Sequence, residues 1–186
     1  HLELLRYFDI DELLNEKSAP AIWEAANAKL STPQMSARNL LKNKKVEFVG
    51  TTDDPTDDLK AHQALAKTDY SVTVSPSFRP DKGLAIENED FLPWVEKLES
   101  VTNQSIENYD AFLDALSSRV DYFDKHGCRS SDHGINVIFY ENATKDEVAG
   151  IFTKRLKGES LTAAEVEQYK TYTLVFLGEL YADKGW

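Results

Sequence analysis

Three short apolar runs of this chain each end in a dense cluster of polar residues. The clusters are TTDDP at residues 51–55, SPSFRPDK at residues 75–82 and GCRSSDHG at residues 127–134. Helix-like sequence follows each cluster, and this order is how α/β enzymes place reactive groups at the carboxyl ends of parallel strands. The pattern therefore indicates chemistry or ligand binding as well as packing.

Arg79 is the candidate anion-binding residue of the second cluster. It stands between Phe78 and Pro80, so its backbone is restricted, and its planar guanidinium can grip a carboxylate or a phosphate through two parallel hydrogen bonds. Asp81 and Lys82 can orient it. The alternative is a loop salt bridge between Arg79 and Asp81 or a neighbouring acid.

Four acidic residues in the first cluster and directly after it stand within one turn of a predicted helix start: Asp53, Asp54, Asp57 and Asp58. Carboxylates are favoured there by the unpaired N–H groups and by the helix dipole, so capping explains at least two of them without any function. A calcium loop is excluded because the alternating acids, the glycine and the distal Glu of an EF-hand are absent. Asp53 stays a candidate site residue because it lies closest to the strand end.

The third cluster holds Cys128, Arg129, Asp132 and His133. His133 can carry a proton, act as a ligand or donate a hydrogen bond to a substrate. Asp132 and His133 can face one site only if the strand has already ended, because adjacent residues of an extended strand point to opposite faces. A nucleophile pair of Cys128 with His133 and an inert buried thiol both stay open. The chain contains no His-x-His, HExxH or CxxC pattern, so it carries no recognisable metal site by itself.

Helical segments and β-prone runs alternate around these clusters. Helical spacing and capping signals predict short helices within residues 13–43, helices over residues 57–67, 90–100 and 108–126, and two C-terminal helices that begin at the capping boxes of Thr144 and Thr162. Three glycines are placed to end helices: Gly127, Gly158 and Gly185. The β-prone runs are residues 46–49, 72–74 and 135–140, although the last could be a loop beside the real strand. His62 and His126 fall in predicted helices, where surface or packing roles are expected.

Strands joined by helical crossovers imply parallel pairing with right-handed connections. A complete eight-stranded barrel needs about 250 residues, and this chain has 186. We therefore expect an α/β chain with an all-helical part over residues 1–44. Residues 45–186 should form a partial barrel or a small open sheet.

The composition limits the partners. The formal net charge of −11 opposes binding to nucleic acid or to an anionic membrane, since both reward clustered Lys and Arg, so small molecules are the expected ligands. The single cysteine, Cys128, excludes an internal disulfide and fits a reducing cytoplasm. No apolar stretch reaches the length of a membrane span, and the first residues lack a signal-peptide layout. Because His1 stands where an initiator Met is usual, we expect a piece of something larger.

Five motifs together carry a resemblance to a known family. They are HLELLRYF, VEFVGTTDDPTDDLKAHQ, VSPSFRPDKGLAI, HGCRSSDHG and LVFLGELYADKGW, in this order along nearly the whole chain. The chain resembles the middle of uronate isomerase, the glucuronate isomerase of bacterial hexuronate catabolism, which belongs to the amidohydrolase-like metal-dependent barrels. The resemblance implies interconversion of D-glucuronate with D-fructuronate, and of D-galacturonate with D-tagaturonate, by proton transfer between adjacent carbons of the open-chain sugar. It also implies a divalent metal, usually zinc, that polarises the oxygens.

The resemblance further implies which parts of the enzyme this chain lacks. In the family, the metal is expected on a His-x-His pair of the first strand, a later His and a late Asp, none of which lies in this sequence. The chain would then supply a helical insertion over residues 1–44 and barrel strands two to four over residues 45–186, and it should be inactive alone. Arg79 is implied as the grip on the substrate carboxylate. The substrate-binding residues that carry over are Arg79, Asp132, His133, Asp53 and Arg129.

Two other classes of function stay open. A standalone module could bind an anionic sugar or a carboxylate through Arg79 without catalysis, and metal content in the full-length context separates it from the enzyme. A structural interaction domain would use its strand-end clusters only as caps and salt bridges, so changing Arg79 to Ala would leave it unaffected. A partial barrel has unpaired strand edges and uncovered apolar faces, which predict a homo-oligomer or a strand-swapped dimer.

Overall fold

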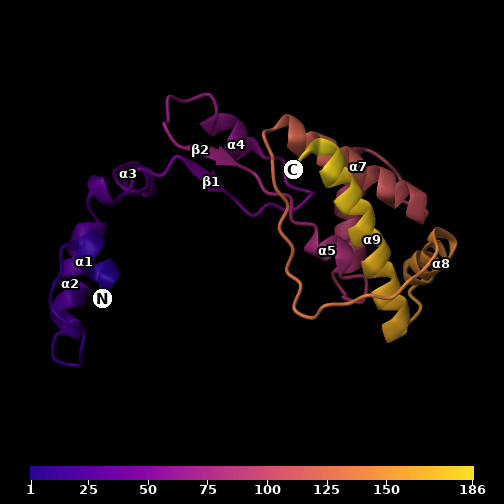
Figure 1. Cartoon of the computed structure of the whole chain (residues 1–186), viewed down its shortest axis with the longest axis horizontal. Helices are drawn as coiled ribbons and strands as arrows, with labels where there is room; N and C mark the ends of the chain where they lie inside the picture. Colours follow the sequence, from indigo (N-terminus) through magenta and orange to yellow (C-terminus); the bar gives the residue numbers. More distant parts are fainter. The chain divides into compact units, whose positions relative to one another are not determined.

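The computed structural model describes residues 1–186, and the chain divides into two compact units. One unit comprises residues 1–48 and the other comprises residues 49–186. Figure 1 labels the helices and strands of each unit. None of the helices combines the length and the apolar character that crossing a membrane requires.

The first unit is built from helices, as the sequence predicts. They are α1 (Leu2–Phe8), α2 (Ala19–Leu30), the 3-10 helix η1 (Pro33–Met35) and α3 (Ala37–Asn43). The Ser36 hydroxyl accepts a hydrogen bond from the Asn39 backbone N–H at 3.4 Å and caps α3, while α1 lies before the predicted helical range. Ile22 is buried, but Trp23 in the same periodic pattern is 72% exposed. This unit therefore has little core of its own.

Two short parallel strands form the sheet, β1 (Phe48–Gly50) and β2 (Thr73–Ser75). The pairing continues past the strand ends, because single parallel bridges join Asp53 to Phe78 and Phe78 to Ser131. The Phe78 N–H donates to the Ser130 carbonyl at 3.0 Å, and the Asp132 N–H donates to the Phe78 carbonyl at 3.0 Å. Three chain segments therefore lie side by side, with residues 77–79 in the middle.

The prediction of a third strand over residues 135–140 is wrong. Residues 130–132 pair with their neighbour through one bridge only, and residues 135–140 form neither helix nor strand. A β-prone run becomes a strand only where a second segment supplies a hydrogen-bonded ladder, and this chain offers none to residues 135–140. The second unit is therefore mostly helical with two strands, and the loop alternative for residues 135–140 is the one observed.

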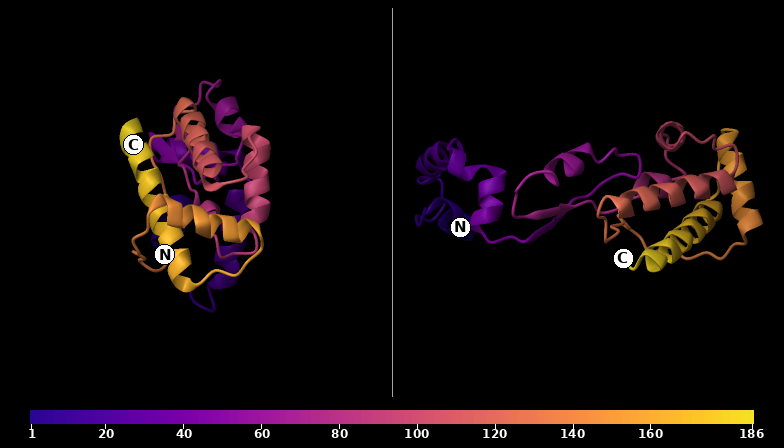
Figure 2. Two further views of the ribbon diagram at one scale, coloured as in Figure 1. Left: turned by 90° about the vertical axis from the view of Figure 1, so that its right-hand side faces the viewer. Right: turned by 90° about the horizontal axis from the view of Figure 1, so that it is seen from above.

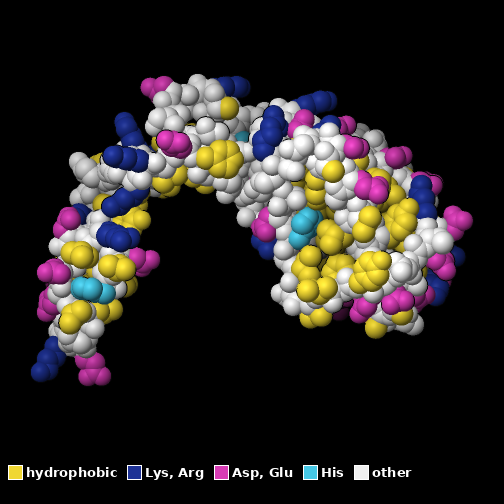
Figure 3. Space-filling model, viewed as in Figure 1, with side chains coloured by type: hydrophobic (Ala, Val, Ile, Leu, Met, Phe, Trp, Pro, Cys, Tyr) yellow, Lys and Arg dark blue, Asp and Glu magenta, His cyan; other side chains and the backbone are white.

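The loop of residues 135–140 carries much of the exposed apolar surface of the second unit. Its exposed members are Ile135, Val137, Ile138 and Tyr140. Figure 1 shows the segment running between α7 and α8, and Figure 3 shows hydrophobic side chains gathered on the visible face of this unit.

Six helices complete the second unit. They are α4 (Lys60–Leu65), α5 (Asp81–Leu84), α6 (Phe91–Thr102), α7 (Tyr109–Lys125), α8 (Lys145–Leu156) and α9 (Ala163–Lys184). Helix α9 packs against α5, α7 and α8, and α6 packs against α5 and α7. Figure 2 shows α9, in yellow, next to α7 from two further directions. The four longest helices enclose one core of buried aromatic side chains: Phe91, Tyr109, Phe112, Phe152 and Tyr169.

Phe78 anchors the middle segment of the sheet in this core. It is fully buried, and its ring lies 5.1 Å from the Phe123 ring centroid in an edge-to-face arrangement and 6.0 Å from Tyr181. Burying an aromatic side chain of this size contributes about 2–3 kcal/mol. Because Arg79 follows Phe78 directly, the core determines where the arginine leaves the sheet.

The predicted helix boundaries are mostly confirmed. Both capping boxes form, Thr144 with Glu147 and Thr162 with Glu165, and the three predicted terminators Gly127, Gly158 and Gly185 have left-handed backbones with φ of 90°, 75° and 69°. The helix predicted over residues 57–67 is shorter, because Leu59 is buried with φ of 52° and α4 begins only at Lys60. The helix therefore starts one residue after the buried leucine.

Candidate functional site

Parallel pairing brings the three predicted clusters together at one edge of the sheet. The Arg79 N–H donates to the Asp53 carbonyl at 2.9 Å, and the Asp132 N–H donates to the Phe78 carbonyl at 3.0 Å. Asp53, Arg79 and Asp132 thus stand on three adjacent segments, although long stretches of sequence separate them. The backbone ladder, and not local sequence, creates this neighbourhood.

Arg79 is held by two acids. Its Nε donates to Asp81 Oδ2 at 2.7 Å, and its Nη1 lies 3.6 Å from Asp132 Oδ2. The side chains of Arg79, Asp81 and Asp132 are 39%, 35% and 50% exposed. The predicted salt bridge with Asp81 is confirmed, and at this exposure it stabilises the fold by only about 0–1 kcal/mol. The Nη1 contact is longer than a hydrogen bond, so Asp132 holds the outer edge of the guanidinium, Nη1 and Nη2, only weakly.

Asp81 joins Arg79 to the third cluster. Its carboxylate accepts the Gly134 N–H at 3.0 Å through Oδ1 and at 3.2 Å through Oδ2, while Oδ2 accepts from Arg79. Lys82 does not orient Arg79, contrary to the sequence expectation, because its Nζ lies 3.8 Å from Asp54. Asp81 alone therefore performs the orienting role that was predicted for the pair.

His133 makes different contacts from its neighbour Asp132. Its ring lies 5.8 Å from the Tyr181 ring on α9, and its Nδ1 is buried without a hydrogen-bond partner. Burial lowers the pKa of His133, with a smaller opposing effect from Asp81 and Asp132 and a smaller lowering effect from Arg79. Asp132 instead faces Arg79, as expected for adjacent residues of an extended segment. A neutral imidazole thus borders the arginine cluster.

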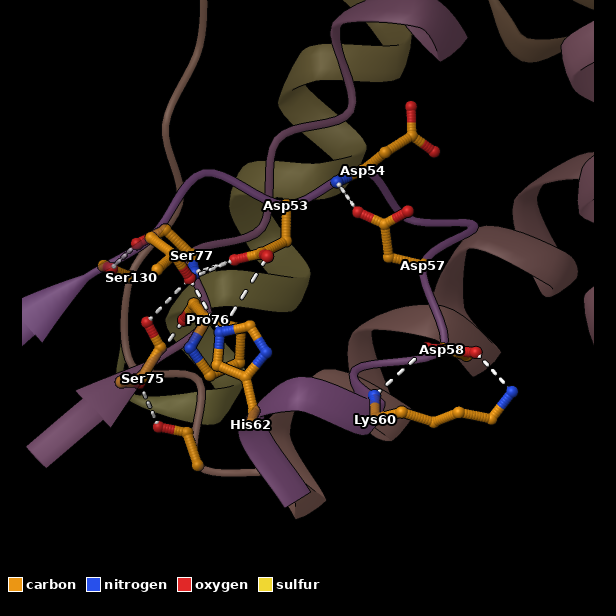
Figure 4. A network of polar contacts seen from close by, with 12 residues as sticks. Asp53, Asp54, Asp57, Asp58, Lys60, His62, Ser75, Pro76, Ser77 and Ser130 are labelled. Carbon is orange, nitrogen blue, oxygen red and sulfur yellow. Dashed lines mark hydrogen bonds and ion pairs between the residues drawn. The ribbon is translucent and has the colours of Figure 1, made fainter. Parts of the chain in front are cut away.

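Asp53 belongs to a second network on the other side of the middle segment (Figure 4). Its Oδ2 accepts from the Thr51 hydroxyl at 2.6 Å and from the Ser77 N–H at 3.3 Å, and its Oδ1 lies 3.9 Å from His62 Nε2. His62 Nε2 also lies 2.8 Å from Thr51 Oγ1. Asp53 therefore ties β1, β2 and α4 together, and Figure 4 shows its carboxylate turned toward His62.

His62 is the network member that the sequence analysis missed. It was expected to be a surface or packing residue, yet its side chain is only 12% exposed and is hydrogen-bonded to Thr51. Its position in the first turn of the helix after the TTDDP cluster was the available signal.

The remaining acids, Asp54, Asp57 and Asp58, serve structure, but the predicted helix capping is mostly wrong, because the N-cap of α4 is Leu59 without a side-chain hydrogen bond. Asp57 accepts the Asp54 N–H at 3.0 Å, and Asp58 accepts the Lys60 N–H at 3.0 Å at the start of α4. Asp54 accepts from the Trp94 indole and from Thr56. Figure 4 shows Asp54 pointing away from the Asp53 network. None of these three acids reaches Arg79.

Arg129 and Cys128 stand apart from the arginine cluster. Arg129 Nη1 pairs with Asp124 Oδ1 at 3.0 Å at the end of α7. Cys128 is fully buried and its thiol donates to the Ser130 carbonyl at 3.2 Å. Burial raises the pKa of this thiol, and no hydrogen bond joins it to His133. The buried-thiol alternative is the one observed.

A second cation was not anticipated from sequence. Arg119 on α7 is buried, and it donates through Nε to the Pro55 carbonyl at 2.6 Å and through Nη2 to the Asp57 carbonyl at 2.8 Å. Its Cζ lies 4.0 Å above the centre of the Tyr122 ring. Arg119 therefore holds the loop that follows the Asp53 network, and only its place on an otherwise apolar helix face could have indicated this.

A cavity of about 750 Å³ opens beside the arginine cluster. Its walls come from α5, the loop after it, the segment of residues 134–139 and the start of α9. Asp81 and Gly134 line it, whereas Arg79, Asp132 and His133 do not. The hydrogen-bond geometry, and not this cavity, defines the candidate site.

The chain does not by itself assemble a metal centre. Nowhere do three His, Cys, Asp or Glu side chains converge closely enough to hold an ion. The donors present therefore do not fit the divalent metal that the resemblance implies.

The fold and the cluster together define an α/β protein segment with polar groups gathered at the ends of parallel chain segments. The chain belongs to the glucuronate isomerase family, whose sequence model matches residues 1–186.

Relatives of known sequence agree with this assignment. The chain is 54% identical over 187 residues to the uronate isomerase of Caldicellulosiruptor saccharolyticus, covering 100% of this chain and 40% of the relative. It is 44% identical to the uronate isomerase of Clostridium acetobutylicum, again over 100% of this chain and 40% of the relative. The chain thus spans about 40% of the length of the curated relatives it matches.

Two solved structures share the fold. The crystal structure of uronate isomerase from Thermotoga maritima has a TM-score of 0.90 and 32% identity, over 100% of this chain and 41% of that one. The glucuronate isomerase structure from Caulobacter crescentus also has a TM-score of 0.90, at 23% identity, over 98% of this chain and 38% of that one. The second likeness supports the fold alone.

Proposed function

We propose that this chain corresponds to a section of an aldose-ketose isomerase that acts on uronates, and that Arg79 grips the carboxylate of the substrate. The reaction would interconvert D-glucuronate with D-fructuronate, and D-galacturonate with D-tagaturonate. Membership of the glucuronate isomerase family supports the reaction class. The observation that carries the residue assignment is the partly exposed guanidinium of Arg79 beyond the carboxyl end of β2.

The geometry of Arg79 supports carboxylate binding. Asp81 occupies Nε at 2.7 Å, while Asp132 stands 3.6 Å from Nη1. An incoming carboxylate can replace the longer contact and form two parallel hydrogen bonds along the Nη1 and Nη2 edge. Asp81 would stay in place and keep the guanidinium oriented, so the substrate competes with only one acid.

His133 is the second group of this chain that we assign to substrate binding. Its neutral imidazole borders the arginine cluster and can donate a hydrogen bond to a sugar hydroxyl or accept one from it. Asp132 can accept from a hydroxyl once the carboxylate takes its place on Arg79. Asp53 and Arg129 would act on the substrate site at longer range. Asp53 would act through the sheet, and Arg129 would act through the end of α7.

The proton transfer itself is not assigned to residues of this chain. The isomerisation moves a hydrogen between two adjacent carbons at the aldehyde end of the sugar, far from the carboxylate. We propose that the groups that transfer this proton, and the metal centre of the family, lie in parts of the enzyme that this chain does not supply. Residues 45–186 would then contribute two parallel strands, with residues 130–132 paired beside them, to the barrel.

A coupled uronate isomerase assay with added zinc tests the proposal, run in parallel on the full-length gene product and on this chain. We expect turnover only in the full-length product. Activity in neither would favour a non-catalytic module that binds an anionic sugar or a carboxylate. Activity in this chain alone would show that the catalytic groups lie within residues 1–186.

A further inference from the structure

Gly134 lies unusually close to the Arg79 and Asp81 pair. A Cβ placed on Gly134 would stand 2.7 Å from Asp81 Oδ2 and 3.0 Å from Arg79 Nη2. The first distance is shorter than real Cβ contacts allow, and the second is tighter than most of them. Any side chain at this position would therefore push against both partners of the ion pair.

Backbone conformation does not explain this glycine. The glycines with left-handed backbones are Gly127, Gly158 and Gly185, and Gly134 is not among them. Its N–H donates to both oxygens of Asp81, at 3.0 Å and 3.2 Å. An alanine can adopt the same φ and ψ. The reason for a glycine at this position is therefore the close approach of Asp81 and Arg79, which leaves little room for a Cβ.

We propose that Gly134 and Asp81 are positioning residues for Arg79, which together select the edge of the guanidinium that meets a ligand carboxylate. This inference rests on the proposed function, in which Arg79 binds the uronate. The Gly134 N–H and Arg79 Nε hold the Asp81 carboxylate from two sides. Because Nε is occupied, the Nη1 and Nη2 edge is left for the substrate.

The bare Cα of Gly134 is as important as its N–H. A Cβ on Gly134 would stand 3.0 Å from Arg79 Nη2 as well as against Asp81, so a side chain there would crowd the guanidinium on that side. A methyl group there would move the Asp81 carboxylate, the guanidinium or both by several tenths of an ångström. A bidentate contact depends on the plane of the guanidinium, so such a shift weakens carboxylate binding without removing the charge.

The first test is the ¹⁵N–¹H signal of Arg79 Nε in this chain, identified by its loss in Arg79→Lys. We expect Gly134→Ala to move this signal toward that of a solvent-exposed arginine. Gly150→Ala is the matched control, because nothing lies within 4 Å of a Cβ at that position, and it should leave the signal unchanged. An unchanged Arg79 signal in Gly134→Ala would overturn the inference.

The second variant, Asp81→Asn, guards against a folding defect in Gly134→Ala. It removes the charged acceptor of Nε and keeps the side-chain size, so we expect the same direction of shift. An unshifted signal in Asp81→Asn would overturn the inference too.

The third measurement is titration of the same samples with D-glucuronate, with D-glucose as the ligand that lacks a carboxylate. Gly134→Ala should weaken glucuronate binding about tenfold, the scale expected for one charge-assisted hydrogen bond, and leave glucose unaffected. If the unaltered chain binds no glucuronate, the assignment of Arg79 as a carboxylate grip fails for the isolated chain, whereas the Arg79 signal still decides the positioning role. Equal glucuronate affinity in Gly134→Ala and the unaltered chain would count against the positioning role.

Discussion

The indole Nε1 of Trp94 donates to both carboxylate oxygens of Asp54, at 2.9 Å and 3.0 Å. Asp54 Oδ1 also accepts from the Thr56 N–H at 2.9 Å and from its hydroxyl at 2.7 Å. Trp94 is buried on α6, so this carboxylate fastens the loop after β1 to the helical core. Asp53, one residue earlier, belongs to the network with Thr51 and His62. The two acids therefore have different structural roles.

Replacing Asp54 with Asn should destabilise the second unit. The amide keeps one acceptor oxygen but presents an N–H₂ group to donors, so we expect a loss of about 1–3 kcal/mol in the free energy of unfolding. Urea denaturation followed by tryptophan fluorescence measures it. The control is Asp58→Asn, whose pair with Lys60 is exposed and screened by solvent, so this change should have little effect. Equal effects of the two changes would contradict the assignment of Asp54 to the core.

Replacing Arg119 with Lys should be costly although the charge is kept. The guanidinium reaches two backbone carbonyls and covers the Tyr122 ring, and a single ammonium cannot reproduce this fork. We expect a loss of about 2–4 kcal/mol in the free energy of unfolding, because buried carbonyls lose their donors. The surface change Arg129→Lys, measured in the same way, should stay within about 1 kcal/mol. A stable Arg119→Lys protein would show that the loop is held by other contacts.

The Cys128 thiol should be unreactive in the folded chain. It is fully buried, and burial raises its pKa, so little thiolate forms near neutral pH. We expect a disulfide reagent such as DTNB to label Cys128 slowly in buffer and rapidly in urea. Fast labelling of the folded chain would instead support the nucleophile alternative for this cysteine.

Stability should fall on mild acidification because of His133. Burial lowers its pKa below the usual value of 6.5, so the unfolded chain takes up a proton before the folded chain does. The contribution is fully present above about pH 6.5 and is lost as the pH falls through the lowered pKa of the folded state. Urea midpoints measured from about pH 7.5 to about pH 5.5 should decrease. His133→Gln should flatten this slope, and an identical slope in both proteins would exclude His133 as its source.

Arg79→Lys separates charge from geometry in uronate binding. The change keeps a positive charge but removes the bidentate fork, so in the full-length gene product we expect the KM for D-glucuronate to rise about tenfold or more. The fold should be unaffected, because the ion pair with Asp81 is partly exposed. An unchanged KM would move the carboxylate grip to another residue and would favour the purely structural interpretation of this cluster.

Local features of this chain were predictable because they act over a few residues. The capping boxes of Thr144 and Thr162 form as expected, since a side chain and the N–H groups three positions later meet in any helix start. Gly127 ends α7 for the same local reason. The five motifs shared with the family likewise required no structure.

The neighbourhood of Arg79 was only partly predictable. The pair with Asp81 follows from their spacing, but the contact with Gly134 arises because the segment of residues 130–132 pairs with residues 77–79. No pattern in the sequence measures that register. The same holds for His62 and Arg119, whose partners lie in loops on other elements.

Whether a β-prone run formed a strand depended on a second segment that pairs with it, and not on its amino-acid composition. Residues 135–140 have the β-branched and aromatic side chains of a strand, yet they form a loop because no segment of this chain pairs with them in a hydrogen-bonded ladder. Helices satisfy their hydrogen bonds within one stretch of sequence, so the sequence alone placed most of them, although α1 and α5 were not predicted and α4 begins later than expected. Strands and the Arg79 site need groups supplied by distant residues, so only the folded chain decided which of the candidates came together.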